Sequence, residues 1–231
     1  MGLNTAVSRV CATCSTSWGK PGLAGVPSIP NRRPTRSRLL KKLPATLQAI
    51  AAAHPDQTIE LWCQDETRVG QKGRRTHGWA PKGSRPPVPI DTRYENAYIF
   101  GAFCPERGCA VGLILPHANT AMMQLHLNEI SAALPAQVHA AMITDGAAWH
   151  RAQALRIPAN ITLIAIPPAT PECNPAEKPW QYLKDNFLSH RVFVTYQDIL
   201  DACQQAWNSM LNESGRIASL TSMHHLISHE T

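Results

Sequence analysis

The stretch VHAAMITDG, residues 138–146, is a nearly continuous apolar run that ends in Asp145 and Gly146. Such a run predicts a strand that is buried on both faces and leads into a loop. A second apolar run, TIELWCQD (58–65), also ends in an acid, Asp65. Because ligand sites in open α/β sheets gather in the crevice at strand ends, both acids are candidates for a functional site.

The segments around these two runs predict an α/β fold. Apolar and alternating patterns indicate further strands at 76–81, 97–104, 109–116 and 161–168. Helical patterns cover 43–54, 174–188, 196–211 and a segment that Asn119 or Thr120 caps and that runs to Leu134. Antiparallel strands followed by alternating helices and strands favour a mixed central sheet flanked by helices.

The charge of the chain is unevenly distributed. The 231 residues include 22 Lys and Arg and 16 Asp and Glu, a net charge of +6, which favours an anionic partner such as nucleic acid. No acid precedes Asp56, so the positive excess lies wholly within the first 42 residues. Segment 1–42 is rich in Pro and Arg and is expected to be disordered. A short helix and linker (43–56), a folded domain (57–212) and a C-terminal tail (213–231) are expected to follow.

Several classes of protein are excluded by the same composition. No run of 18 apolar residues is present, so no membrane span is expected. The N-terminus lacks the apolar stretch of a secretory signal. Seven cysteines are an odd number without the density of a disulfide scaffold, which favours a reduced, cytoplasmic protein.

A third acid, Glu177, lies in the first turn of the helix that IPPATPECNP (166–175) introduces. Each of the three acids has a structural alternative, because Asp before Gly is ordinary in turns and Glu is favoured at helix starts. Three carboxylates at one sheet edge would repel one another unless a cation neutralised them. Mg²⁺ prefers oxygen ligands, and two such ions support phosphodiester cleavage.

Three segments resemble the catalytic blocks of mariner-like DDE transposases, most closely those of bacterial insertion sequences: ELWCQDETRVGQKGRRTHGWAPKGSRP (60–86), MITDGAAWH (142–150) and IPPATPECNPAEKPWQYLKD (166–185). The resemblance implies an RNase H-like fold for the domain at 57–212. It also implies a catalytic triad of Asp65, Asp145 and Glu177 that holds two Mg²⁺ or Mn²⁺ ions. The implied activity is DNA strand cleavage and strand transfer at transposon ends, with a homodimer in the active complex and no membrane partner.

Residues next to the triad receive supporting roles. Strand alternation predicts that Glu66 faces the opposite side of the sheet from Asp65, in a structural role. Asn174 is expected to cap the helix that carries Glu177. Trp180 follows three residues after Glu177, and core packing is the alternative role for its side chain.

Basic residues near the first block are candidates for DNA phosphate contacts, because no acid lies between Glu66 and Asp91. Lys184 and His150 are further candidates, and a solvated surface is the alternative for the basic loop and for Lys184. The basic residues of the loop are Arg68, Lys72, Arg74, Arg75, Lys82 and Arg85.

The N-terminus departs from the resemblance. Family members carry helix-turn-helix modules before the catalytic domain, whereas about 55 residues precede the first block here. We expect either a truncation or the translation of residues 1–37 in a shifted reading frame. The alternatives for function are a catalytically inactive remnant that only binds DNA and an RNase H-like host nuclease. A location in the bacterial cytoplasm with the nucleoid is expected in each case.

Overall fold

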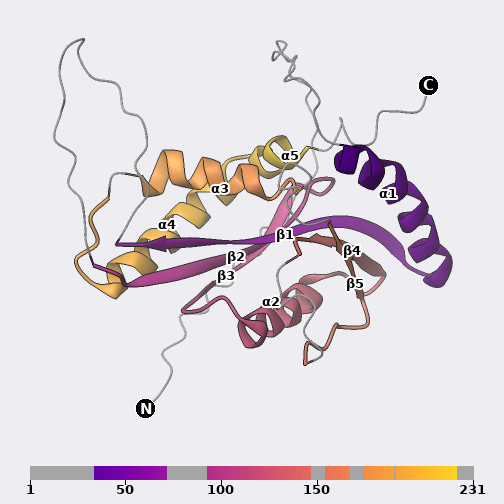
Figure 1. Cartoon of the computed structure of the whole chain (residues 1–231), viewed down its shortest axis with the longest axis horizontal. Coiled ribbons are helices and arrows are strands. Elements are labelled where there is room, and N and C mark those ends of the chain that lie inside the picture. Colours follow the sequence, from indigo (N-terminus) through magenta and orange to yellow (C-terminus); the bar gives the residue numbers. More distant parts are fainter. Residues whose placement is uncertain (1–33, 72–92, 147–153, 167–173, 190, 223–231) are drawn as a thin grey trace, which may run out of the picture.

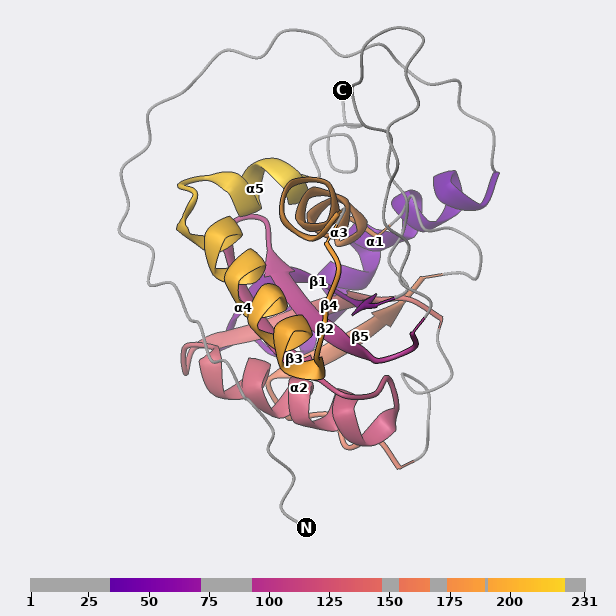
Figure 2. The same cartoon turned by 90° about the vertical axis from the view of Figure 1, so that its left-hand side faces the viewer.

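The computed structural model of the chain describes residues 34–71, 93–146, 154–166, 174–189 and 191–222. A central β-sheet lies between two layers of helices (Figures 1 and 2). None of the helices in these ranges is long and apolar enough to cross a membrane.

The sheet has five strands in the order β3-β2-β1-β4-β5. β1 pairs antiparallel with β2, which pairs antiparallel with β3, whereas β4 is parallel to both β1 and β5. This mixed sheet confirms the expected fold class. The strands are β1 (Thr58–Gly70), β2 (Asn96–Cys104), β3 (Cys109–Leu115), β4 (Val138–Thr144) and β5 (Ile161–Ala165).

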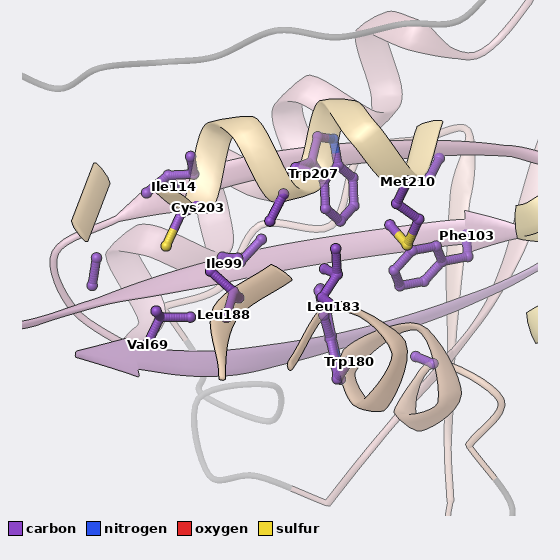
Figure 3. Packing of buried hydrophobic residues seen from close by; sticks show 14 of the residues in the cluster. Val69, Ile99, Phe103, Ile114, Trp180, Leu183, Leu188, Cys203, Trp207 and Met210 are labelled. Atoms are coloured by element: carbon purple, nitrogen blue, oxygen red, sulfur yellow. The ribbon is translucent and has the colours of Figure 1, made fainter. Parts of the chain in front are cut away.

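Each face of the sheet packs on a different set of helices. One face lies against α2 (Thr120–Ala133), whose Met123 and Leu127 are fully buried. The other face lies against α3 (Glu177–Leu183), α4 (Tyr196–Asn212) and α5 (Arg216–Thr221). Its core is built around Phe103, Trp180 and Trp207 (Figure 3). Burial of these large side chains supplies much of the driving force for folding.

Two glycines allow the tryptophans to approach the sheet closely. Gly101 on β2 and Gly112 on β3 are direct partners in the sheet. A Cβ atom on Gly101 would lie 2.5 Å from Cη2 of Trp180, and one on Gly112 would lie 2.4 Å from Cζ2 of Trp207. Only a residue without a side chain fits at these two positions.

Most of the expected elements are confirmed. Asn119 caps α2 by accepting a hydrogen bond from the Met122 N–H at 3.0 Å. The helix expected at 196–211 is α4, which begins with a capping box between Thr195 and Asp198. The helix expected at 174–188 is α3 followed by a π-helical turn at Lys184–Leu188. The strand expected at 76–81 lies outside the described residues.

Three boundaries differ from expectation. The strand expected at 58–65 continues to Gly70, because its pairing with β2 extends that far. Helix α1 (Pro34–Ala53) begins within the segment expected to be disordered. Pro is well suited to a first helical turn, and the Leu, Arg and Lys residues that follow it are good helix formers. Helix α5 lies within the expected tail, because its Ile217 and Thr221 are buried against the domain. The division of the chain into four segments otherwise stays a prediction, and residues 1–33 lie outside the described residues.

Candidate active site

Two adjacent parallel strands bring Asp65 and Asp145 together. β1 and β4 are paired so that Cys63 lies opposite Ile143. Two residues further along each chain come Asp65, which is still within β1, and Asp145, which directly follows the end of β4. The parallel register therefore places the two acids at the same level of the sheet, although only Asp145 lies at a strand end.

Glu66 joins these two acids, which strand alternation does not predict. Asp65, Glu66 and Asp145 each offer a carboxylate oxygen, and these oxygens lie within 4.8 Å of one another. β4 ends at Thr144, so residues 65 and 66 of β1 have no β4 residue paired beside them. At this open flank, side chains from both faces of β1 can reach Asp145. We call these three residues the acidic cluster.

Two carboxyl groups of the acidic cluster have raised pKa values. Burial raises the pKa of Asp65 to about 7, and the negative charges of Asp145 and Glu177 add to the rise. Hydrogen bonds from the Glu66 N–H and the Trp180 indole act in the opposite direction. Burial, followed by the charges of Asp65 and Asp145, raises the pKa of Glu66 to about 8. Such shifts are typical of carboxylates held together without a cation.

Trp180 contacts the acidic cluster directly. Its indole Nε1 donates a hydrogen bond to Oδ2 of Asp65 at 3.1 Å. The ring is 4% exposed and packs edge-to-face on Phe103, with centroids 5.3 Å apart. The expected core role of Trp180 is therefore accompanied by a polar contact with Asp65. This contact joins residues 115 positions apart and has no signature in the local sequence.

Asn174 links the third sequence block to β1. Its Nδ2 donates to the Gln64 carbonyl at 3.0 Å, and its Oδ1 accepts from the Ala176 N–H at 3.2 Å. Asn174 is 5% exposed. Its side chain closes the turn before α3 and is not the N-cap, which is Ala176. Asn174 therefore fixes the start of α3 beside Asp65.

Glu177, the first residue of α3, is exposed and lies outside the acidic cluster. Its charge nevertheless contributes to the raised pKa of Asp65, so the two carboxylates are within electrostatic reach of each other. The three predicted triad residues thus lie in one region of the molecule. Asp65 and Asp145 are in close proximity, whereas Glu177 is more distant.

Two of the predicted DNA-contacting residues are described. Arg68 on β1 is exposed, and Lys184 at the end of α3 is half-buried. The other predicted contacts lie outside the described residues: Lys72, Arg74, Arg75, Lys82, Arg85 and His150.

The acidic cluster fits a hard divalent cation. Its ligand atoms are carboxylate oxygens, the type that Mg²⁺ and Mn²⁺ accept, and their separation allows one ion to contact all three. Burial is the main cause of the raised pKa values of Asp65 and Glu66, and the negative charge that adds to them would also attract a cation.

Residues 60–200 match the family of DDE superfamily endonucleases, a stretch that covers more than half of the chain. The chain therefore belongs to this family. It is 46% identical over 124 residues to the uncharacterized protein y4pE/y4sA of Sinorhizobium fredii (strain NBRC 101917 / NGR234), a match that covers 54% of this chain and 92% of that protein.

The fold is similar to that of Mos1 mariner transposase. A pre-cleavage Mos1 transpososome matches with a TM-score of 0.58 and 17% identity over 90% of this chain and 64% of the Mos1 chain. The Mos1 catalytic domain matches with a TM-score of 0.53 and 15% identity over 87% of this chain and 92% of that domain. The chain spans about 63% of the Mos1 chain in the paired-end complex with Mn. The domain is thus a DDE superfamily endonuclease domain with an RNase H-like fold similar to that of the Mos1 catalytic domain.

Proposed function

We propose that this domain cleaves DNA strands at transposon ends and transfers them to target DNA, with Asp65, Asp145 and Glu177 holding two Mg²⁺ or Mn²⁺ ions. The observation that carries the proposal is the acidic cluster, formed by two residues of β1 and by the residue that follows the adjacent parallel strand β4, in a domain of the DDE family. Divalent ions at such a site activate a water or hydroxyl and stabilise the leaving oxygen of a phosphodiester.

The chain's own residues hold and orient the carboxylates. Asp65 is fixed by the β1 ladder and by the indole of Trp180. The start of α3 is tied to Gln64 through Asn174, which holds the backbone at Glu177 near Asp65 and leaves the exposed Glu177 side chain room to turn toward the acidic cluster. Such supporting contacts keep ligands within the narrow geometry that metal-dependent cleavage requires.

Glu66 is a competing candidate for the third carboxylate, because it lies in the acidic cluster and Glu177 does not. We propose that Glu177 moves in to complete the site when metal and DNA bind, while Glu66 adds negative charge. A pair of matched variants separates the two acids. Glu177→Gln should abolish metal-dependent nicking, and Glu66→Gln should retain part of it. The reverse result would assign the third ligand to Glu66.

DNA is the proposed partner, both as transposon end and as target. The Mos1 structures that this fold resembles include a paired-end complex and a strand transfer complex. Exposed Arg68 lies on β1 two residues after Glu66, where a phosphate entering the site would pass. We propose that Lys184, His150 and the basic residues of segment 72–85 extend this contact, in a homodimer that acts in the bacterial cytoplasm.

The central experiment is a plasmid nicking assay with the full chain in Mg²⁺, Mn²⁺ or EDTA. Wild-type protein should nick supercoiled DNA only with a divalent ion, and Asp145→Asn should not nick it. Asp201→Asn is the matched control, since Asp201 is an exposed acid on α4. Calorimetric titration with Mn²⁺ provides a second readout. Loss of metal binding in Asp145→Asn supports the site, and failure of the wild type to bind metal contradicts the proposal.

The same experiment separates the alternatives. Metal binding and DNA binding without nicking would indicate a catalytically inactive remnant. Nicking without preference for any DNA end, together with cleavage of RNA–DNA hybrids, would indicate a host nuclease of the RNase H type.

A further inference from the structure

Two cysteines face each other at the end of the β2–β3 hairpin. Cys104 is the last residue of β2, Cys109 is the first residue of β3, and the two are direct partners in the antiparallel register. Directly opposed residues in such a pair have Cα atoms about 4.5–5.5 Å apart. A disulfide requires about 4.4–6.8 Å, so the hairpin backbone already satisfies this condition.

Both cysteines are free thiols in contact with each other. The Cys104 thiol is within hydrogen-bonding reach of Cys109, its register partner, and of Oε2 of Glu60. Cys104 is fully buried, whereas Cys109 is 7% exposed next to the turn at residues 105–108, in which Glu106 is exposed. Cys109 is therefore the more accessible of the two thiols.

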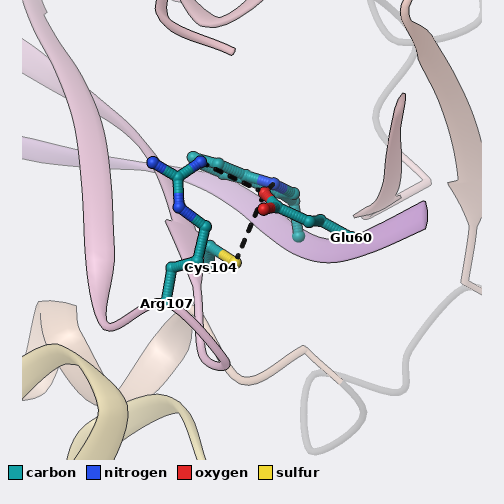
Figure 4. A network of polar contacts seen from close by, with 4 residues as sticks. Glu60, Cys104 and Arg107 are labelled. Atoms are coloured by element: carbon teal, nitrogen blue, oxygen red, sulfur yellow. Dashed lines mark hydrogen bonds and ion pairs between the residues drawn. The ribbon is translucent and has the colours of Figure 1, made fainter. Parts of the chain in front are cut away.

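The polar surroundings give the two thiols different properties. Arg107, in the turn between them, pairs with Glu60 at 3.3 Å, and Sγ of Cys104 lies 3.9 Å from the same carboxylate (Figure 4). The hydrogen bond from Cys104 and the charge of Arg107 lower the pKa of Cys109. The same hydrogen bond and burial raise the pKa of Cys104. Cys109 is thus the better nucleophile, and Cys104 is the neighbouring thiol that retains its proton.

The other two described cysteines lack this arrangement. Burial raises the pKa of Cys63 above its usual range, and it raises that of Cys203 to about 12. Both lie in the core on the other face of the sheet, among the residues that pack on α3, α4 and α5. They are structural thiols and provide internal controls.

We propose that Cys104 and Cys109 form a reversible disulfide when the protein meets hydrogen peroxide, and that this bond closes the β2–β3 hairpin. The Cys109 thiolate attacks one peroxide oxygen and the O–O bond breaks. The hydroxide that leaves takes up the proton that Cys109 had lost and becomes water. The sulfur of Cys104 then attacks the resulting sulfenic acid, its S–O bond breaks, and a second water leaves as the S–S bond forms. Two thiols and one peroxide give one disulfide and two waters, and a dithiol reductant reverses the change.

A non-reducing tryptic digest tests this proposal directly. Trypsin cleaves after Arg107, so Cys104 and Cys109 fall in different peptides, 94–107 and 108–151. The native full chain is treated with peroxide, alkylated and digested. We expect the two peptides to be joined, with a mass two hydrogen atoms below their sum, and to separate after treatment with dithiothreitol.

Three variants serve as controls. Cys104→Ser and Cys109→Ser should each abolish the joined peptide, and Cys203→Ser should leave it unchanged. Oxidised wild type should melt a few degrees above the reduced protein, and this difference should vanish in Cys104→Ser. The proposal is overturned if both cysteines remain fully alkylated after peroxide, or if Cys109 pairs instead with Cys11, Cys14 or Cys173.

Discussion

Strand β1 carries a buried acid, Glu60, and two half-buried acids, Asp65 and Glu66, whose surroundings differ. Glu60 is 7% exposed, and its Oε2 accepts hydrogen bonds from Trp62 at 3.1 Å and from Arg107 at 3.3 Å. The other site is the acidic cluster, where burial and neighbouring negative charges raise the pKa values of Asp65 and Glu66.

A buried carboxylate requires donors or a counter-charge. Glu60 obtains its hydrogen-bond donors and its counter-charge from Trp62 and Arg107 of the same chain, and so contributes to the fold. The second site brings three carboxylates together, an arrangement that costs stability unless a cation binds. We infer that Glu60 is a structural acid and that the acids of β1 in the acidic cluster are functional ones.

The largest expected effect comes from removing one charge of the acidic cluster. Asp145→Asn should lower Mg²⁺-dependent nicking by about 10³-fold, since it removes a metal ligand. The fold should persist, because the change relieves repulsion with Asp65. The measurement is nicking rate together with circular dichroism.

Glu60→Gln is the complementary variant, because it removes the charge of the structural acid. It should weaken folding and leave the nicking rate of the folded protein unchanged. Equal loss of nicking in Asp145→Asn and Glu60→Gln would abolish the distinction between the two sites.

The second prediction concerns the indole donor of the acidic cluster. Gly101→Ala places a methyl group 2.5 Å from Cη2 of Trp180 and should destabilise the protein by about 2–3 kcal/mol. Displacement of Trp180 should also weaken its hydrogen bond to Asp65 and reduce Mn²⁺ affinity. Urea denaturation and calorimetry measure the two effects.

Gly112→Ala is the matched control for this prediction. Its methyl group would lie 2.4 Å from Trp207 and should cost similar stability. Mn²⁺ affinity should nevertheless stay at the wild-type level. A comparable loss of affinity in both variants would show that Trp180 has no specific role at Asp65.

The sequence was sufficient to predict that Asp65 and Asp145 lie close together, for identifiable reasons. Asp65 and Asp145 end apolar runs, and strand periodicity is a local property that one chain segment reveals. Their proximity follows from the parallel pairing of β1 and β4, a pairing that the expected mixed sheet allows. The expected cap at Asn119 is equally local, because it depends on a side chain three residues before Met122.

The remaining features depend on contacts between distant segments. Alternation predicts Glu66 on the face opposite Asp65, but it does not reveal that β4 ends before residue 66, which leaves both carboxylates within reach of Asp145. The Trp180 contact with Asp65 depends on how α3 crosses the sheet. The ion pair of Glu60 with Arg107 depends on the antiparallel pairing of β1 with β2 and on the turn that follows β2.

The third prediction uses pH to separate the two sites. The pKa values of Asp65 and Glu66 in the folded protein, about 7 and about 8, lie above those of the unfolded chain. Their contribution to stability is therefore fully present below about pH 4 and is lost as the pH rises through 7 to 8. Without divalent ions, the free energy of unfolding should therefore fall between pH 4 and pH 8.

Mg²⁺ should offset this loss mainly above pH 7, where the carboxylates are ionised. Urea denaturation at pH 5 and pH 8, with EDTA or Mg²⁺, measures the effect. Glu66→Gln should flatten the pH dependence, while Asp201→Asn should not. An identical pH dependence in wild type and Glu66→Gln would contradict the assignment of the shift to the acidic cluster.

The smallest expected effect is at the structural acid. Arg107→Met leaves the Glu60 carboxylate with the Trp62 indole and the Cys104 thiol as neighbours. We expect the free energy of unfolding to fall by about 1 kcal/mol, a modest value because the Arg107 side chain is 36% exposed and partly screened by solvent. Arg156→Met, at an exposed position, should change stability by less. Mg²⁺ should not restore the stability of Arg107→Met, because the counter-charge of Glu60 comes from the chain.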